Sequence, residues 1–333
     1  MQNTSSIEMR RLSYSLGSLL SIEEVLDCSQ KLNEVRPEVM WIPETWGMEN
    51  FSMLGIASRQ NKFSKIGSSI INIYSRSPSL IAMGATTVDR ISDGRLILGL
   101  GTSSKSIIEN FHGQSFKNPV QRMRECVEII RLALSGKKIT YSGKIFSLKE
   151  FSLLTKPLRK EIPIYLAAIN QKMVELSWDI ADGVIFYLRP KEEMKKTISN
   201  MQKKREIDTS LQIITCIDND YEKAVSRAKK TLSFYIAVGE IYREFLESNG
   251  YSEETQIIYN EYAKTGLGNL EKLVPDKMLD DLCIAGTPDV AIKKLNAFRD
   301  VGIDLPIIQF NPIGNVKDSF QLLTTTFSGE VDE

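Results

Sequence analysis

The stretch from Lys65 to Ser104 contains a complete strand–helix–strand unit, and it limits the possible fold more than any other part of the chain. Residues 65–73 are mostly apolar and β-branched, as expected of a buried strand. Ser77 and Pro78 form a typical helix start, with an N-cap followed by proline at the first helical position. A second apolar run at 95–100 predicts another strand. Two such strands joined by a crossover helix run parallel, so the stretch predicts a βαβ unit.

The same alternation of apolar runs and amphipathic segments continues along the chain. Further buried strands are predicted at residues 11–16, 39–42, 162–167, 183–188, 211–217 and 305–310, with helices between them. Eight strands that alternate with helices favour a single (β/α)8 barrel, a TIM barrel, over residues 1–333. A doubly wound open sheet is the alternative.

Two connections are too long for simple crossovers and are predicted to be insertions. The first, at about residues 105–160, follows the fourth strand and holds a hairpin at 139–146 folded about Ser142 and Gly143. The second, at about residues 220–285, follows the seventh strand and is largely helical. In a barrel of this kind the ligand site lies at the carboxyl ends of the strands.

The composition argues against several classes of function. Lys and Arg together number 42, as do Asp and Glu, so no overall positive charge favours a nucleic-acid partner. No apolar run approaches the ~18 residues of a membrane-spanning helix, and the N-terminus lacks the apolar segment of a secretory signal, so we expect a cytoplasmic protein. The four cysteines are widely spaced and His112 is the single histidine, so neither a disulfide framework nor a metal site is expected.

The predicted strand ends are rich in small, hydroxyl and amide side chains, with aromatic residues such as Trp41 and Tyr187 beside them. No Walker sequence and no G-x-S-x-G elbow occur, which argues against a P-loop enzyme or a serine hydrolase. Such a site suits a planar cofactor between apolar walls, with its phosphate bound by N–H groups at helix starts. Hydride transfer fits because the cofactor carries the reactive atom and the protein positions it.

Several motifs occur in a fixed order: Ser-Arg-Ser-Pro at 75–78, Ala-Thr-Thr-Val-Asp-Arg-Ile-Ser-Asp-Gly-Arg at 85–95, and Leu-Gly-Leu-Gly at 98–101. Ile-Ala-Asp-Gly at 180–183 and Ala-Gly-Thr-Pro at 285–288 follow. Together they resemble the bacterial luciferase-like superfamily, and within it the F420-dependent methylenetetrahydromethanopterin reductase-like oxidoreductases. The resemblance implies a TIM barrel, a homodimer and coenzyme F420 as cofactor, with FMN as the alternative.

The resemblance also implies roles for residues at the strand ends. Glu44 matches an acidic residue beside the deazaflavin ring and would be the catalytic acid, although a carboxylate that caps the next helix would look the same. Thr45 replaces a histidine common at that position, and would contact the cofactor. The Ser69–Ile70 peptide matches a non-prolyl cis bond beneath the ring. Further cofactor contacts are implied for Asn72, Gly101, Thr102, Ala167, Ala168 and Asn170.

Three other residues carry open alternatives. Ser15 stands where the reductases carry a glutamate at the end of the first strand, and it is a candidate for the substrate side. His112 is a second substrate-side candidate, although a histidine in an insertion is more often structural. Arg76 either meets a phosphate or carboxylate of the cofactor, or forms an ion pair with Asp89 or Asp93.

The sequence therefore predicts an F420-dependent oxidoreductase that passes a hydride between the deazaflavin and a small organic or tetrahydromethanopterin-like substrate. An FMN-dependent luciferase-like monooxygenase is one alternative. A non-catalytic barrel paralogue that binds a cofactor without turnover is another, because the first-strand glutamate is absent.

Overall fold

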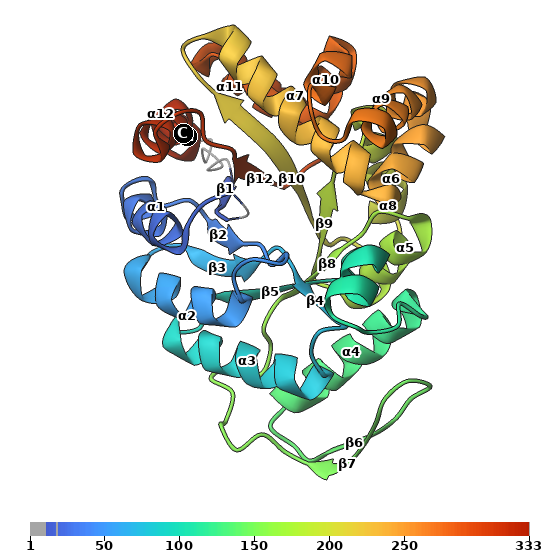
Figure 1. Cartoon of the computed structure of the whole chain (residues 1–333). Helices are drawn as coiled ribbons and strands as arrows, with labels where there is room; N and C mark the ends of the chain where they lie inside the picture. The colour runs from blue at the N-terminus through green and yellow to red at the C-terminus, as the bar shows by residue number, and fades with distance from the viewer. Residues whose placement is uncertain (1–10, 18, 333) are drawn as a thin grey trace, which may run out of the picture.

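The computed structural model describes residues 11–17 and 19–332, so Ser18 and residues 1–10, in which a secretory signal was sought, lie outside it. Ten strands form one sheet (Figure 1). They are β1 (Ser13–Ser15), β2 (Val39–Ile42), β3 (Lys65–Ser68), β4 (Ile71–Asn72), β5 (Leu96–Gly101), β8 (Ile164–Ala167), β9 (Gly183–Tyr187), β10 (Asp208–Ile217), β11 (Cys283–Gly286) and β12 (Leu305–Phe310). A separate hairpin consists of β6 (Ile139–Ser142) and β7 (Ser147–Phe151).

Eight of these strands close a parallel barrel. The order is β1-β2-β3-β5-β8-β9-β10-β12, and β12 pairs with β1 to complete the ring. β4 continues β3 after a break and pairs with β5. β11 pairs with the second half of β10, outside the ring. The predicted TIM barrel is confirmed, and the open-sheet alternative is wrong.

Helices follow the strands and cover the outside of the barrel (Figure 1). They are α1 (Ile22–Val35), α2 (Asn50–Gln60), α3 (Pro78–Ile91), α4 (Pro119–Leu134), α5 (Gln171–Ile180), α6 (Lys191–Gln202), α7 (Tyr221–Val238), α8 (Glu240–Leu246), α9 (Ser252–Thr265), α10 (Asp276–Leu282), α11 (Pro288–Arg299) and α12 (Val316–Asp332). Shorter helical segments are η1 (Ile107–Phe111), η2 (Glu247–Tyr251) and η3 (Leu270–Leu273). In the part of the chain that the structure describes, no helix is long and apolar enough to cross a membrane.

Helix caps fix the points where the chain leaves a strand. Ser77 is the N-cap of α3, as predicted, and its hydroxyl accepts a hydrogen bond from the Leu80 N–H at 3.1 Å. Helix α1 begins with a reciprocal capping box between Ser21 and Glu24. These bonds satisfy N–H groups of the first turn, which lack partners within the helix. They therefore define where each helix begins against the barrel.

The barrel interior holds an apolar cluster that is separate from the layer between the barrel and the helices. Trp41 is fully buried there and packs beside Tyr165, with ring centroids 5.9 Å apart. The indole lies over Gly67, where a Cβ atom would stand 2.3 Å from it. Only glycine leaves room for Trp41 at this position, and the interior is filled by side chains, as in other TIM barrels.

Two predictions for the insertions need correction. The hairpin turns at residues 143–146, and its second strand runs to Phe151 instead of ending at Phe146. The second insertion contains the helices α7–α10, and strand β11 (Cys283–Gly286), which was not predicted, follows them. β11 has only four residues and directly follows α10, so no turn residues separate it from the helix in the sequence.

Candidate active site

The carboxyl ends of the barrel strands bring polar side chains onto the inner face of the barrel. Alternate residues of a strand face the same side. A residue that lies two or four positions after a member of the interior cluster, on the same strand, therefore also faces inward. Its register partner on the neighbouring strand faces the same way. We call this end of the barrel the mouth. The residues that line it by this argument are Ser15, Gly101, Ala167, Tyr187, Gln212 and Gln309.

Ile70 forms an apolar floor in the mouth. Its side chain lies over Gly101, where a Cβ atom would stand 2.5 Å from Ile70 Cδ1 and 3.3 Å from Ala167 Cβ. The peptide between Ser69 and Ile70 is cis, as the resemblance implies. Ser69 Oγ is buried, and it has no hydrogen-bond partner among the described residues. The structure thus brings Ser69, Ile70, Gly101 and Ala167 together.

Ser68 bridges the break between β3 and β4. Its hydroxyl donates to the Gly99 carbonyl at 2.8 Å and accepts from the Gly99 N–H at 2.9 Å, so one side chain replaces a pair of backbone bonds. Between the paired positions Gly67–Ile97 and Ile71–Leu100, three residues oppose two. This bulge turns the Ser69–Ile70 segment toward the mouth.

Asn72 and His112 meet although they come from the third barrel strand and the first insertion. Asn72 Nδ2 lies 3.4 Å from His112 Nε2. Asn72 Oδ1 accepts hydrogen bonds from the N–H groups of Tyr74 and Ser75, which fixes the orientation of the amide. Its Nδ2 donor therefore faces Nε2 of the His112 imidazole.

Glu44 forms a bidentate ion pair with Arg76. The two guanidinium nitrogens lie 2.8 and 2.7 Å from the two carboxylate oxygens. Oε1 also accepts a hydrogen bond from the Asn50 N–H at the start of α2, at 3.2 Å. Glu44 therefore has a helix-capping contact, the alternative considered above, as well as a charged partner. All of these contacts use Glu44 as an acceptor.

Of the two alternatives for Arg76, the ion pair with Asp89 or Asp93 is wrong. Arg76 contacts Glu49 in addition to Glu44, whereas Asp89 pairs with Arg159 from the end of the first insertion, at 2.7 Å. The side chain of Arg76 is only 12% exposed. Two carboxylates therefore neutralise this buried guanidinium, which leaves it little free charge for a cofactor phosphate.

The remaining predicted residues lie at other strand ends with separate partners. Thr45 and Thr102 are half-buried, and the Thr102 hydroxyl donates to the carbonyl of the next residue at 3.3 Å. The Ala168 N–H donates to a carbonyl of β9 at 3.2 Å, so it is already used within the barrel. Asn170 is the N-cap of α5, and its side chain accepts from an N–H of the first turn at 3.2 Å.

Sequence reasoning missed two glutamines in the mouth. Gln212 Nε2 donates to Gln309 Oε1 at 3.2 Å. Together with Ser15 they line a cavity of about 10 Å³, which is room for a single water-sized group. A signal was present, because each glutamine is a polar residue inside an otherwise apolar strand, in Leu-Gln-Ile and in Ile-Gln-Phe.

The second insertion adds an aromatic wall beside these glutamines. Tyr187 of β9 packs edge-to-face against Tyr235 of α7 and Tyr242 of α8, with ring centroids 5.2 and 5.5 Å apart. Burial raises the pKa of all three phenols above the ordinary tyrosine value. The wall therefore carries no charge at neutral pH.

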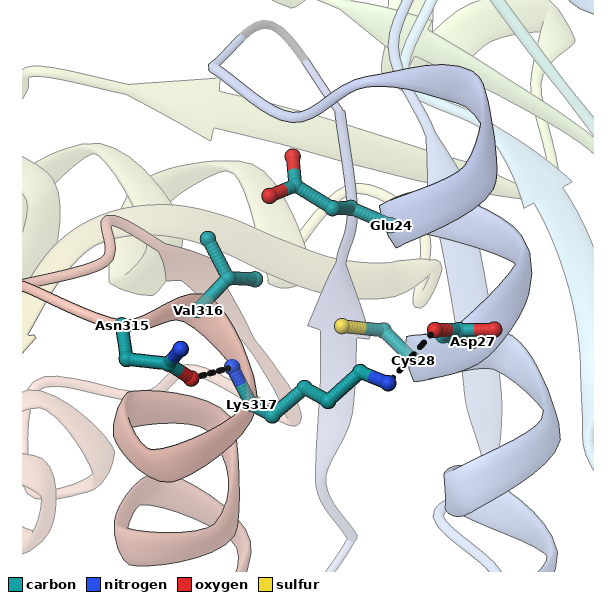
Figure 2. A pocket seen from close by; sticks show the side chains of 6 residues that line it. All are labelled: Glu24, Asp27, Cys28, Asn315, Val316 and Lys317. Carbon is teal, nitrogen blue, oxygen red and sulfur yellow. Dashed lines mark hydrogen bonds and ion pairs between the residues drawn. The ribbon is translucent and has the colours of Figure 1, made fainter.

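A larger cavity lies outside the barrel, between α1 and the start of α12 (Figure 2). It measures about 140 Å³ and is lined by Glu24, Asp27, Cys28, Asn315, Val316 and Lys317. Lys317 Nζ lies 3.4 Å from Asp27, and Glu24 caps its own helix. Burial raises the pKa of the Cys28 thiol to about 12, so it stays protonated. The mouth is therefore the candidate active site.

The sequence matches the luciferase-like monooxygenase family over residues 7–305. The 5,10-methylenetetrahydromethanopterin reductase of Archaeoglobus fulgidus is 33% identical over 298 residues, which cover 85% of this chain and 88% of that protein. The family match covers both insertions and ends at Leu305, the first residue of β12.

Two solved structures share the fold over nearly the whole chain. The coenzyme F420-dependent tetrahydromethanopterin reductase of Methanopyrus kandleri has a TM-score of 0.84 at 22% identity, covering 95% of this chain and 97% of that chain. An F420-dependent secondary alcohol dehydrogenase in complex with an F420–acetone adduct has a TM-score of 0.77 at 18% identity, covering 97% of this chain and 99% of that chain. The chain therefore belongs to the luciferase-like monooxygenase family, in which it groups with the methylenetetrahydromethanopterin reductase-like oxidoreductases.

Proposed function

We propose that the protein is an F420-dependent oxidoreductase that moves a hydride between the deazaflavin and a small organic or tetrahydromethanopterin-like substrate. The observation that carries this proposal is the 33% identity over 298 residues to the Archaeoglobus fulgidus reductase. It is supported by the site, because the residues that the resemblance selects at the third, fourth and fifth strand ends are neighbours in the mouth.

The mouth fits a planar cofactor on two observations. Ile70 offers an apolar surface, and a residue larger than glycine at position 101 would displace its side chain. Beside it, the buried Ser69 Oγ lacks a partner among the described residues, and a buried hydroxyl normally has one. A bound polar ring edge would satisfy this hydroxyl. Ser69, Ile70, Gly101 and Ala167 would hold the ring, and the bound deazaflavin would supply the carbon that gives or takes the hydride.

The protein side of the reaction is positioning and proton handling. Glu44 is the candidate acid, and Arg76 and the Asn50 N–H hold its carboxylate in one orientation. In this pairing Glu44 is an acceptor, so it donates a proton only after it has taken one up. The uncharged wall of Tyr187, Tyr235 and Tyr242 excludes water from one side of the mouth.

Titration with the two candidate cofactors tests the proposal. Purified protein is titrated with F420 and, separately, with FMN, and the cofactor fluorescence is followed. We expect saturable binding of F420 and at least tenfold weaker binding of FMN. Tight binding of FMN without binding of F420 would contradict the proposal and favour the monooxygenase alternative, for which oxygen consumption with reduced FMN is the next measurement. Binding of F420 without turnover of methylenetetrahydromethanopterin or secondary alcohols would favour the non-catalytic paralogue.

A further inference from the structure

A chain of side-chain amides runs along the base of the mouth. Gln212 Nε2 donates to Gln309 Oε1 at 3.2 Å, and Gln309 Nε2 donates to Asn311 Oδ1 at 3.5 Å. The far end is anchored on the backbone, because Asn311 Nδ2 donates to the Gln309 carbonyl at 2.8 Å and to the Thr215 carbonyl at 3.5 Å. Gln309 and Asn311 are only 7% and 1% exposed, so water does not compete freely for these bonds.

The anchor decides which way each amide faces. A carbonyl oxygen can only accept, so the group of Asn311 that meets the two carbonyls is its NH2, and its oxygen faces Gln309. Gln309 must therefore present its NH2 to Asn311 and its oxygen to Gln212. Gln212 in turn must use its NH2 toward Gln309. The oxygen of Gln212 remains as a hydrogen-bond acceptor. Its orientation is set through the chain by the backbone carbonyls that Asn311 contacts.

The oxygen of Gln212 has no hydrogen-bond partner in the part of the chain that the structure describes. Gln212 Oε1 is buried and makes no hydrogen bond with any described residue. Gln212 lines the cavity of about 10 Å³ that it shares with Ser15 and Gln309, so one polar atom of a ligand fits beside it. Tyr187, its partner in register on β9, provides an aromatic wall without charge. A buried acceptor left without a donor costs free energy, so a ligand donor is favoured here.

We propose that Gln212 is a ligand-positioning residue whose amide oxygen receives an N–H or O–H donor of a neutral, planar or small organic ligand. The inference rests on the proposed function for the identity of that ligand, which is either the ring edge of the cofactor or the substrate. The chain from Gln212 through Gln309 to Asn311 makes the site selective for a donor, because it prevents the amide from turning its NH2 group toward the ligand.

Two substitutions at one position test the amide oxygen and the chain that orients it. Gln212→Leu removes the amide, and we expect binding to weaken about tenfold, the usual effect of one buried hydrogen bond. Gln212→Glu keeps an oxygen acceptor but has no NH2 group for Gln309 Oε1, so two acceptors meet, the chain breaks, and we expect binding to weaken as well. Ser210→Ala is the matched control, because Ser210 lies on the same strand and its buried hydroxyl also lacks a partner among the described residues. Circular dichroism melting of each variant reports folding independently of binding.

The two ligand sources are measured separately. F420 affinity is measured by fluorescence titration. The KM for methylenetetrahydromethanopterin is measured separately, at saturating reduced F420, which supplies the hydride. A tenfold loss of F420 affinity in Gln212→Leu assigns the donor to the cofactor. A rise in KM without a change in F420 affinity assigns it to the substrate. If Gln212→Leu matches Ser210→Ala in both quantities, the inference is overturned while the proposed function stands. Failure of the wild-type protein to bind F420 overturns both.

Discussion

Glu44 and Arg76 lie 32 positions apart in the sequence, yet each is the main polar partner of the other. Sequence reasoning selected both residues, but for Arg76 it weighed only a cofactor contact against an ion pair with Asp89 or Asp93. Several acidic residues compete for one arginine, and the sequence does not contain the distances that decide between them. The ion-pair partner of the candidate acid was therefore not predictable from residue types alone.

Replacement of Glu44 tests its role as the acid. Glu44→Gln keeps the shape of the side chain and an oxygen for the Arg76 contact, but cannot deliver a proton. Loss of a general acid typically costs ~100-fold or more in rate, so we expect kcat to fall by this amount with little change in F420 affinity. Steady-state turnover and fluorescence titration measure the two quantities.

Glu49→Gln is the control for this experiment. Glu49 contacts the same Arg76, but its side chain is 48% exposed and caps α2. We expect its turnover to stay close to that of the wild-type protein. Equal losses of kcat in the Glu44 and Glu49 variants would show that the carboxylates act only by holding Arg76.

Which side chains face the inside of the barrel was the other question that the sequence left open. Strands of a parallel barrel are apolar on both faces, so their residues do not alternate in polarity. Trp41 and Met40 are adjacent and both fully buried, although Trp41 belongs to the interior cluster and Met40 to the layer beneath the helices. Gln212 and Gln309 stand out as polar residues in apolar strands, but the sequence does not show which face of the strand they occupy. Only the register places them at the mouth.

At the scale of elements, most boundaries could be predicted because they have local causes. The start of α3 follows from Ser77 and Pro78. β3 lies within the predicted run at 65–73, and β5 extends one residue beyond the predicted run at 95–100. β11 and the bulge at Ser68 were not predictable, because each depends on a partner strand. A hydroxyl that replaces backbone hydrogen bonds across two strands leaves no trace in the sequence.

Glu125 shows how one carboxylate fixes an insertion. It lies on α4, is 1% exposed, and accepts hydrogen bonds from the N–H groups of Lys144, Ile145 and Phe146 in the hairpin turn. Glu125→Ala leaves three N–H groups without their acceptor, so we expect the free energy of unfolding to fall by about 2–3 kcal/mol. Chemical denaturation followed by circular dichroism measures the change. Glu128→Gln is the control, since its single bond from Tyr141 Oη can be kept by an amide oxygen.

The same contacts predict a dependence on pH. Burial opposes ionisation of Glu125, but the hydrogen bonds from Gln121 and the hairpin N–H groups hold its pKa below the ordinary glutamate value. A lowered folded-state pKa means that the contribution to stability is complete at neutral pH and is lost as the pH falls through that value. The difference in unfolding free energy between wild-type protein and Glu125→Ala should therefore shrink in acid. A difference that stays constant down to strongly acidic pH would contradict this assignment.

Over the whole molecule, the two ends of the barrel have different tasks. The amino end is closed by a charged network, in which Arg11 pairs with Glu38 at 2.6 Å and with Asp208 at 2.7 Å. Tyr165 also donates to Asp208. These contacts join β1, β2, β8 and β10 across the end opposite the mouth. The carboxyl end instead holds groups without a partner among the described residues, such as Ser69 Oγ and Gln212 Oε1. In TIM barrels the first end serves stability and the second serves binding.

Arg11→Met tests this division of the barrel. Removal of the cation leaves Asp208 and Glu38 partly buried without their partner, and we expect the free energy of unfolding to fall by about 1–3 kcal/mol. This is below the range for a fully buried pair, because the Arg11 side chain is 37% exposed. F420 affinity should stay within about twofold of wild type, since Arg11 lies at the opposite end from the mouth. Lys65→Met is the control, as Lys65 meets the same Glu38 from a side chain that is 54% exposed, and its loss should cost less than about 1 kcal/mol. A folded Arg11→Met protein with normal stability and weakened F420 binding would show that the two ends are coupled and would refute the division.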